Sequence, residues 1–186
     1  SFFFCLVAHP EDAYVRVSDL VEQWAAFQGA ACDDADVDDM LLEGTAVCLQ
    51  LVDRSLILLD ESDLLCDMRC HLHDLVRDMG LFQAAASANL MQRERLLFPH
   101  WRSLEHCTVD AREMSISGSS LGCWPEGFRA PFLVSLVSRE LAYTELPPCL
   151  HFSRSLRMLD FSNSAIQKVD ASIKHLDLLE VLRVDD

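Results

Sequence analysis

Apolar residues recur at helical spacing in two stretches near the start of the chain. The first stretch follows Ser18, which suits an N-cap, and ends at Gly29; its apolar stripe consists of Leu20, Val21, Trp24 and Phe27. The second follows the acidic residues 33–39, whose carboxylates favour the positive end of a helix; its stripe consists of Met40, Leu41, Val47, Cys48, Leu51 and Val52. These stretches predict two amphipathic helices.

A short hairpin and a third helix are predicted next. Residues 56–59 form an apolar run, residues 60–63 are turn-like, and residues 64–69 form a second run. Residues 70–79 (CHLHDLVRDM) then predict a helix, because Leu72, Leu75, Val76 and Met79 fall on one helical face. The order of helix, helix, wing and helix predicts a small winged-helix domain, mostly α with a β wing.

His73 and Asp74 lie off this apolar stripe, at the first turn of the third predicted helix. A helix start exposes unpaired N–H groups and the positive end of the macrodipole, so a histidine there is well placed to meet a phosphate oxygen. A surface histidine near a helix start would show the same pattern. The motifs around the pair must therefore decide between the two interpretations.

A period of 23 residues runs through the last part of the chain. It relates Leu133, Leu156 and Leu179, and also Leu136, Leu159 and Leu182, while Phe161 and Val184 repeat a third apolar position. Met114 and Ile116 begin the same pattern about 22 residues earlier, within the period range of leucine-rich repeats. The spacing and the L-x-x-L-x-L form therefore predict a short leucine-rich-repeat solenoid, and the chain as a whole is predicted to be α/β.

Each predicted repeat supplies a short strand whose alternate residues enter the core. Leu156, Leu159 and Phe161 are expected to point inward, and Ser164 takes the position of the ladder Asn of the general repeat pattern. Exposed residues of the concave face are then expected to bind a protein partner: Arg157, Met158, Asp160, Ser162, Glu180 and Arg183. Val181 and Asp185 are also expected to be exposed.

These patterns divide the chain into three parts. Residues 1–83 are predicted to form the winged-helix domain, residues 84–108 a helical connector, and residues 109–186 the repeats. The chain has no initiator Met and stops just after a repeat strand without a polar capping unit, so we expect a piece of a longer protein with an open edge at its end.

The charge is strongly negative and unevenly distributed. The 186 residues carry a formal charge of −15, and residues 1–80 contain seventeen Asp and Glu against four Lys and Arg. Such a domain repels nucleic acid, which argues against DNA binding by the winged helix. No run is long enough for a membrane span, and the apolar start lacks the basic flank and cleavage site of a signal peptide, so a cytoplasmic location is expected.

The eight cysteines form no regular framework, which favours reduced thiols over disulfides. Cys66, Cys70 and His73, with His71 beside them, approach the spacing of zinc ligands. A second ligand pair at hairpin distance is missing, and the two histidines would compete for one position. No metal site is therefore predicted.

Four ordered segments resemble motifs of plant NB-LRR disease-resistance receptors. Residues 2–12 (FFFCLVAHPED) resemble the aromatic run that opens the winged-helix domain of that family, although His9 stands where the family has Phe and removes a ring from a packed position. Residues 19–29 (DLVEQWAAFQG) resemble the helix that follows, and residues 51–57 (LVDRSLI) the segment before the wing. Residues 72–74 resemble the family's MHD motif, with Leu72 in the place of Met.

The resemblance implies a nucleotide switch. In the family the motif's histidine contacts the β-phosphate of ADP and holds the receptor inactive, which assigns ADP sensing to His73 and Asp74. The nucleotide-binding domain would have to be supplied by the rest of the receptor, since this chain has no Gly-rich phosphate loop. ADP or ATP is thus the cofactor of an intact receptor, and none is expected for these residues alone.

Two functions remain open at this point. One is a fragment of a plant intracellular immune receptor, whose protein partners are its own nucleotide-binding domain and a pathogen effector or guarded host protein. The other is a stand-alone leucine-rich-repeat scaffold that binds a protein and no nucleotide. An enzyme is disfavoured, because Ser117, Ser119 and Ser120 near Gly118 lack the surroundings of a nucleophile elbow.

Overall fold

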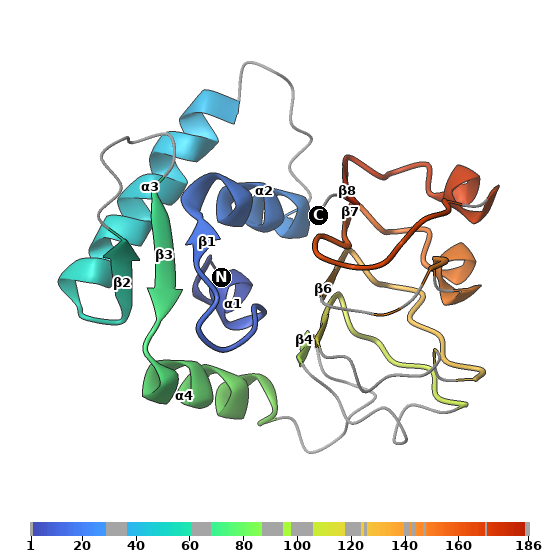
Figure 1. The fold of residues 1–186 in the computed structure, drawn as a ribbon, viewed down its shortest axis with the longest axis horizontal. Helices are drawn as coiled ribbons and strands as arrows, with labels where there is room; N and C mark the ends of the chain where they lie inside the picture. The colour runs from blue at the N-terminus through green and yellow to red at the C-terminus, as the bar shows by residue number, and fades with distance from the viewer. Residues whose placement is uncertain are drawn as a thin grey trace. The chain divides into compact units, whose positions relative to one another are not determined.

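The chain is a mixed α/β protein that divides into two compact units, residues 1–83 and 84–186 (Figure 1). The computed structural model describes residues 2–28, 37–60, 68–86, 95–97, 106–117, 124, 126–139, 142, 144–146, 148–169 and 171–184. The first unit combines helices with a small antiparallel sheet, and the second contains a parallel sheet. Gly29, Cys66, Asp185 and the Ser119–Ser120 pair, singled out from the sequence, lie outside the described residues.

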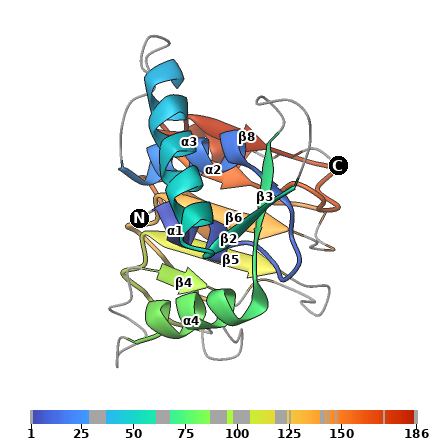
Figure 2. The ribbon, with the colours of Figure 1, turned by 90° about the vertical axis from the view of Figure 1, so that its left-hand side faces the viewer.

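Helices surround a small sheet in the first unit. The described helices are α1 (Phe2–Val7), α2 (Val17–Gln28), α3 (Val37–Asp53) and α4 (Asp74–Ala84). The strands are β1 (Val15–Arg16), β2 (Ile57–Asp60) and β3 (Arg69–Leu72), and β3 lies in the middle, antiparallel to both neighbours (Figure 1). Figure 2 shows β2 and β3 from another side. The predicted order of two helices, a hairpin and a helix is confirmed, whereas α1 and β1 were not predicted.

The second strand of the hairpin extends past its predicted end at residue 69, and residues 64–67 of the predicted run lie outside the described residues. Cys70, His71 and Leu72 belong to β3, where Leu72 pairs with Ile57, and α4 begins only at Asp74. The prediction that residues 70–73 start the helix was therefore wrong. Pairing on both sides of β3 overrides the helical spacing, because it satisfies the backbone hydrogen bonds of this segment and buries Cys70 and Leu72.

The core of the first unit forms mainly from α1 and α2. Leu20, Val21 and Phe27 of the predicted stripe are buried, and the ring of Trp24 meets that of Phe2 edge to face at 5.8 Å between centroids. The helix starts at Val17, whose N–H donates to the Met68 carbonyl, so Ser18 lies inside it and is not its N-cap.

His9 is buried and packed in the position where the family resemblance would place Phe. Its Nε2 lies 3.2 Å from the side-chain oxygen of Gln23, which is also buried, and Arg77 of α4 donates to the His9 carbonyl at 3.1 Å. A buried polar ring is tolerated when it has such a partner. The expectation that His9 removes a ring from a packed position was wrong, because the imidazole is itself packed there and makes a polar contact to α2.

A glycine lets α3 approach α2 closely. A Cβ built at Gly44 would lie 2.3 Å from Cγ2 of Val21, so there is no space for a side chain. Among the residues of α3 whose burial the structure describes, Gly44 and Cys48 are buried, whereas Leu41 of the predicted stripe is exposed. The close contact selects the face of the helix that is buried, and this face differs from the predicted stripe in that it includes Gly44 and not Leu41.

Replacing Gly44 by Ala is expected to destabilise the first unit by about 1–2 kcal/mol, although Ala is the better helix former. Val21 is β-branched and helical, so it has little rotamer freedom with which to avoid the new methyl group. Urea unfolding followed by circular dichroism measures the loss. The double variant Gly44→Ala/Val21→Ala removes the clash, so we expect it to lose much less unfolding free energy than the sum of the losses in the two single variants. Losses that simply add would contradict the explanation.

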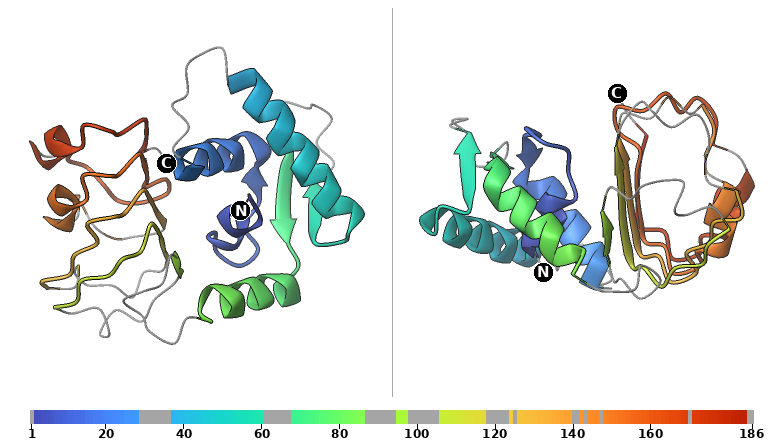
Figure 3. Two further views of the ribbon diagram at one scale, coloured as in Figure 1. Left: turned by 180° about the vertical axis from the view of Figure 1, so that it is seen from behind. Right: turned by 90° about the horizontal axis from the view of Figure 1, so that it is seen from below.

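Parallel strands stack one per turn of chain in the second unit. They are β4 (Arg95–Leu97), β5 (Glu113–Ser117), β6 (Ser135–Arg139), β7 (Met158–Asp160) and β8 (Val181–Arg183), in sequence order. Short 3-10 helices, η4 (Pro148–Phe152) and η5 (Ala171–His175), lie on the opposite side of successive turns (Figure 3, right). The strand spacing predicted from the leucine period is confirmed for β6 to β8.

The register places equivalent residues side by side. Leu136 pairs with Leu159 and Leu159 with Leu182, so one row of leucines crosses three strands. Leu136 and Leu159 are buried in the core of this unit, while Leu182 on the last strand is exposed. Each strand therefore buries the apolar row of its neighbour, as expected when a single repeat cannot form a core alone.

Side-chain hydrogen bonds also link successive turns. The Ser164 hydroxyl donates to the Ser138 carbonyl at 3.1 Å, and the Ser153 hydroxyl to the Ala130 carbonyl at 2.9 Å. Both hydroxyls are buried, and each satisfies a carbonyl of the preceding turn. Ser164 thus occupies a ladder position, as the sequence predicted.

The segment 84–108 contains a strand where a helical connector was predicted. Its residues 95–97 form β4, which pairs in parallel with β5 and extends the sheet by one strand. Local spacing could not predict this strand, because three residues are too few to show a period.

Candidate functional site

His73 caps the first turn of α4. It lies directly before the helix, and its carbonyl accepts hydrogen bonds from the N–H groups of Val76 and Arg77 at 2.9 and 3.0 Å. Its ring Nδ1 accepts a hydrogen bond from the Leu75 N–H at 3.3 Å. The imidazole therefore takes the place that Ser or Asp often occupies at an N-cap. The predicted pair is brought together at the helix start, with His73 as the cap and Asp74 as the first helical residue.

The capping bond also fixes what the rest of the ring can do. A nitrogen that accepts a hydrogen bond carries no proton, so in the neutral ring the proton is on Nε2. The His73 side chain is exposed, and in the part of the chain that the structure describes no group pairs with Nε2. One N–H donor is thus left at a helix N-terminus, where an anionic oxygen is favoured.

Asp74 is exposed at the positive end of α4. A carboxylate there is stabilised by the helix dipole, which gives Asp74 a structural reason to be present. Its negative charge, on the residue next to His73 in sequence, also disfavours a second anion at the helix start. The histidine is therefore the better candidate for a phosphate contact, and Asp74 the better candidate for stabilising the helix start.

A nucleotide would find a single contact of this kind on the described residues. The imidazole donor and the helix start fit one phosphate oxygen. Neither apolar groove identified on the first unit is lined by His73.

Cys70 and His73 do not converge as metal ligands. Cys70 is buried on one face of β3, where its thiol is hydrogen-bonded to that of Cys48 on α3, while His71 and His73 occupy the alternate positions along the chain. The bond to Cys48 and burial raise the pKa of the Cys70 thiol. Among the residues that the structure describes no cluster of metal-ligating side chains occurs, and Cys5, Cys48, Cys70 and Cys107 are free thiols.

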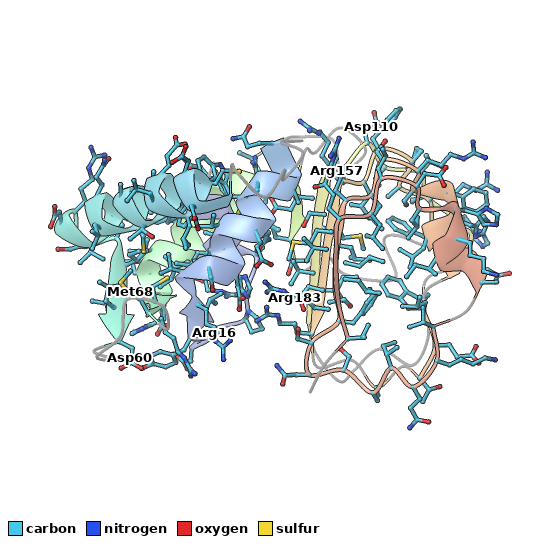
Figure 4. All side chains as sticks on the ribbon, turned by 90° about the horizontal axis from the view of Figure 1, so that it is seen from above. Arg16, Asp60, Met68, Asp110, Arg157 and Arg183 are labelled. Atoms are coloured by element: carbon cyan, nitrogen blue, oxygen red, sulfur yellow. The ribbon has the colours of Figure 1, made fainter. Side chains whose placement is uncertain are left out.

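The predicted partner-binding residues of the repeats differ in exposure. Glu180 is exposed, and Arg157, Ser162 and Arg183 are half-buried; Figure 4 shows Arg183 on the outer side of the strand layer. Met158 and Asp160 were predicted to be exposed and are instead buried. Both lie on β7 between two strands, and the register places Ser135 and Val181 beside Met158.

Asp160 is buried because it has specific partners. Its Oδ2 lies 2.6 Å from Nη2 of Arg139 on β6, and its Oδ1 accepts hydrogen bonds from the N–H and hydroxyl of Ser162 at 2.9 and 2.6 Å. Burial by itself would raise the pKa of Asp160, but the charge of Arg139 and these hydrogen bonds together lower it below the ordinary value. Asp160 is therefore ionised, and its contacts with Arg139 and Ser162 stabilise the fold.

Two further ion pairs join successive turns of the second unit. Arg95 of β4 contacts Glu113 of β5 at 2.8 Å, and Arg157 contacts Glu180. Arg95, Glu113 and Arg139 were not predicted as functional or structural residues. Arg157 and Glu180 lie 23 residues apart, at equivalent positions of successive turns, and this spacing is a signal that could have revealed their pair. Arg139 and Asp160 lie 21 residues apart and are not at equivalent positions.

No protein-family model matches this chain, and no curated protein is significantly similar to it. None of the helices in the described segments combines the length and the apolar character needed to cross a bilayer. The assignment of a function therefore rests on the residues and their geometry.

Proposed function

We propose that the chain is the winged-helix and leucine-rich-repeat portion of a plant intracellular immune receptor, located in the cytoplasm. The observation that carries the proposal is the His73 ring, whose Nδ1 caps α4 and whose Nε2–H is left as a donor at the helix start. The order of elements in the first unit and the stacked parallel strands of the second support it.

The proposed mechanism is a population switch. With ADP held by the nucleotide-binding domain, the Nε2–H of His73 donates to a phosphate oxygen and favours the closed, inactive form of the receptor. Losing this contact favours the open form. The residues of this chain supply the donor, its orientation through the Leu75 N–H, and the favourable potential of the helix start.

Replacing His73 by Ala in the full-length receptor is expected to raise the active fraction without ligand roughly ten- to hundredfold, the range for one hydrogen bond to a charged group. His73→Asn separates the two roles of the ring, because Asn caps helices well and has no imidazole donor. Cell death without pathogen, measured at equal protein level, is the readout, with exposed His175→Ala as a control.

Both His73 variants should be active without pathogen, and the control should remain silent. Activity from Ala alone would show that the cap matters and the phosphate contact does not. Normal silence of both variants would overturn the proposal.

A stand-alone repeat scaffold that binds a protein along the strands is the alternative, and the five-stranded sheet favours it equally. The coding sequence upstream of Ser1 separates the two. A Gly-rich phosphate loop there supports the receptor, and its absence supports the scaffold.

A further inference from the structure

The face of α3 turned away from the core is unusually apolar. Leu42 is 71% exposed, and Leu41 and Leu49 are exposed as well. Residues 41, 45 and 49 are separated by four positions, so their side chains lie one above the other on a single face. With a rise of 1.5 Å per residue, this stripe is about 12 Å long, or two helical turns.

The stripe borders a groove whose other wall comes from distant parts of the chain. Val17 at the start of α2 and Met68 just before β3 line it together with Leu41, Leu42 and Thr45, and its volume is about 420 Å³ (Met68 is marked in Figure 4). The Val17 N–H donates to the Met68 carbonyl, which fixes the position of this wall. The groove is therefore a preformed apolar feature of the first unit.

The charges on helix α3 have one sign, whereas Arg16 and Arg69 flank Val17 and Met68 in sequence on the other wall of the groove. Helix α3 carries four acids, Asp38, Asp39, Glu43 and Asp53, and no Lys or Arg. All four are exposed, and in the described parts of the chain none of them forms an ion pair. Asp53 lies in the last turn of α3, at the negative end of the helix dipole, where a cation would be favoured.

We propose that this face of α3 is a docking surface for a basic amphipathic helix of a partner protein. Apolar side chains of the partner would enter the groove beside Leu41 and Leu42, and its Lys or Arg side chains would pair with Asp38, Asp39 and Glu43. The same acids repel an anionic lipid surface, which argues against a membrane as the occupant. The surface is separate from His73, so this inference does not depend on the nucleotide role proposed above.

The test uses the whole chain and a synthetic helix of Leu and Lys, roughly 18 residues or five turns long, with its leucines in one stripe. A scrambled peptide of the same composition has the same charge and no stripe. Fluorescence anisotropy at about 0.15 M salt, where long-range attraction is screened, measures both affinities. We expect the striped peptide to bind about tenfold more tightly or better, the gain from burying one or more leucines.

A pair of matched variants locates the site. Leu42→Asp should weaken binding of the striped peptide about tenfold, whereas Leu75→Asp on α4 should leave it unchanged, although Leu75 is 65% exposed. Because Leu42→Asp also adds a negative charge, attraction by charge alone predicts the opposite, tighter binding. The triple variant Asp38→Asn/Asp39→Asn/Glu43→Gln should bind more weakly and with a smaller dependence on salt.

The proposal would be overturned if the original chain bound the two peptides with equal affinity, or did not bind the striped peptide at about 1 mM. It would also be overturned if Leu42→Asp bound the striped peptide as tightly as the original chain, or if Leu75→Asp weakened this binding as much as Leu42→Asp does. An unchanged affinity of the triple variant for the striped peptide would contradict it as well.

Discussion

Phe161→Ala should destabilise the repeat unit by about 3–5 kcal/mol, the usual cost of removing a large aromatic ring from a core. Phe161 is 0% exposed and belongs to the apolar cluster that fills the turns of the second unit. It follows β7 directly, and its N–H donates to the Arg183 carbonyl on β8 at 2.7 Å. A cavity at this position thus loosens the contact between two successive turns.

The chain offers a matched control in Phe82 on α4, which is 79% exposed. Phe82→Ala should change the free energy of unfolding by no more than about 0.5 kcal/mol, as is usual for surface substitutions. Urea unfolding by circular dichroism, with hydrogen exchange to assign the loss to the second unit, measures both variants. Equal effects of the two substitutions would show that the ring of Phe161 does not support the repeat core.

Arg139→Met is expected to cost about 3–5 kcal/mol, because it leaves a buried carboxylate without its partner. The Asp160 side chain is 1% exposed and that of Arg139 is 14% exposed, so water replaces little of the lost contact. Arg157→Met is the control. The pair of Arg157 with Glu180 is more exposed, and its loss should cost about 1 kcal/mol or less.

The effect of Arg139→Met should also depend on pH. The folded-state pKa of Asp160 is below its unfolded value, so the pair stabilises the fold above an unfolded pKa of about 3.9, and this contribution is lost as the pH falls through the folded pKa. The difference in unfolding free energy between the original chain and Arg139→Met should therefore be largest near neutral pH and shrink in acid. A difference independent of pH would mean that lost packing, and not charge, causes the effect.

Most elements could be predicted from local patterns, and the failures fall where long-range pairing decides. The leucine period placed β6, β7 and β8 correctly, because one residue pattern per turn is imposed by the stacking itself. The same reasoning missed β4, which has three residues and shows no period. It also assigned residues 70–72 to a helix, although β2 pairs with all three and β1 pairs with Cys70.

The candidate sites show the same division. The sequence placed His73 and Asp74 at a helix start, but the tautomer of the ring follows from the Leu75 N–H, which only the folded backbone brings to Nδ1. Similarly, alternation along β7 correctly put Asp160 on the face opposite Leu159. Its burial depends on Arg139, which lies 21 residues away in sequence and next to it across the sheet.

By itself, the sequence determined the type and order of the main elements, the repeat period and the acidic character of the first unit, because these depend on residues close together in the chain. Only the tertiary structure decided which face of α3 is buried, which acids are paired, and which nitrogen of His73 is left as a donor. Those properties depend on contacts between segments far apart in sequence, such as Gly44 with Val21 and Arg139 with Asp160. The spacing of residues along the chain does not show these contacts.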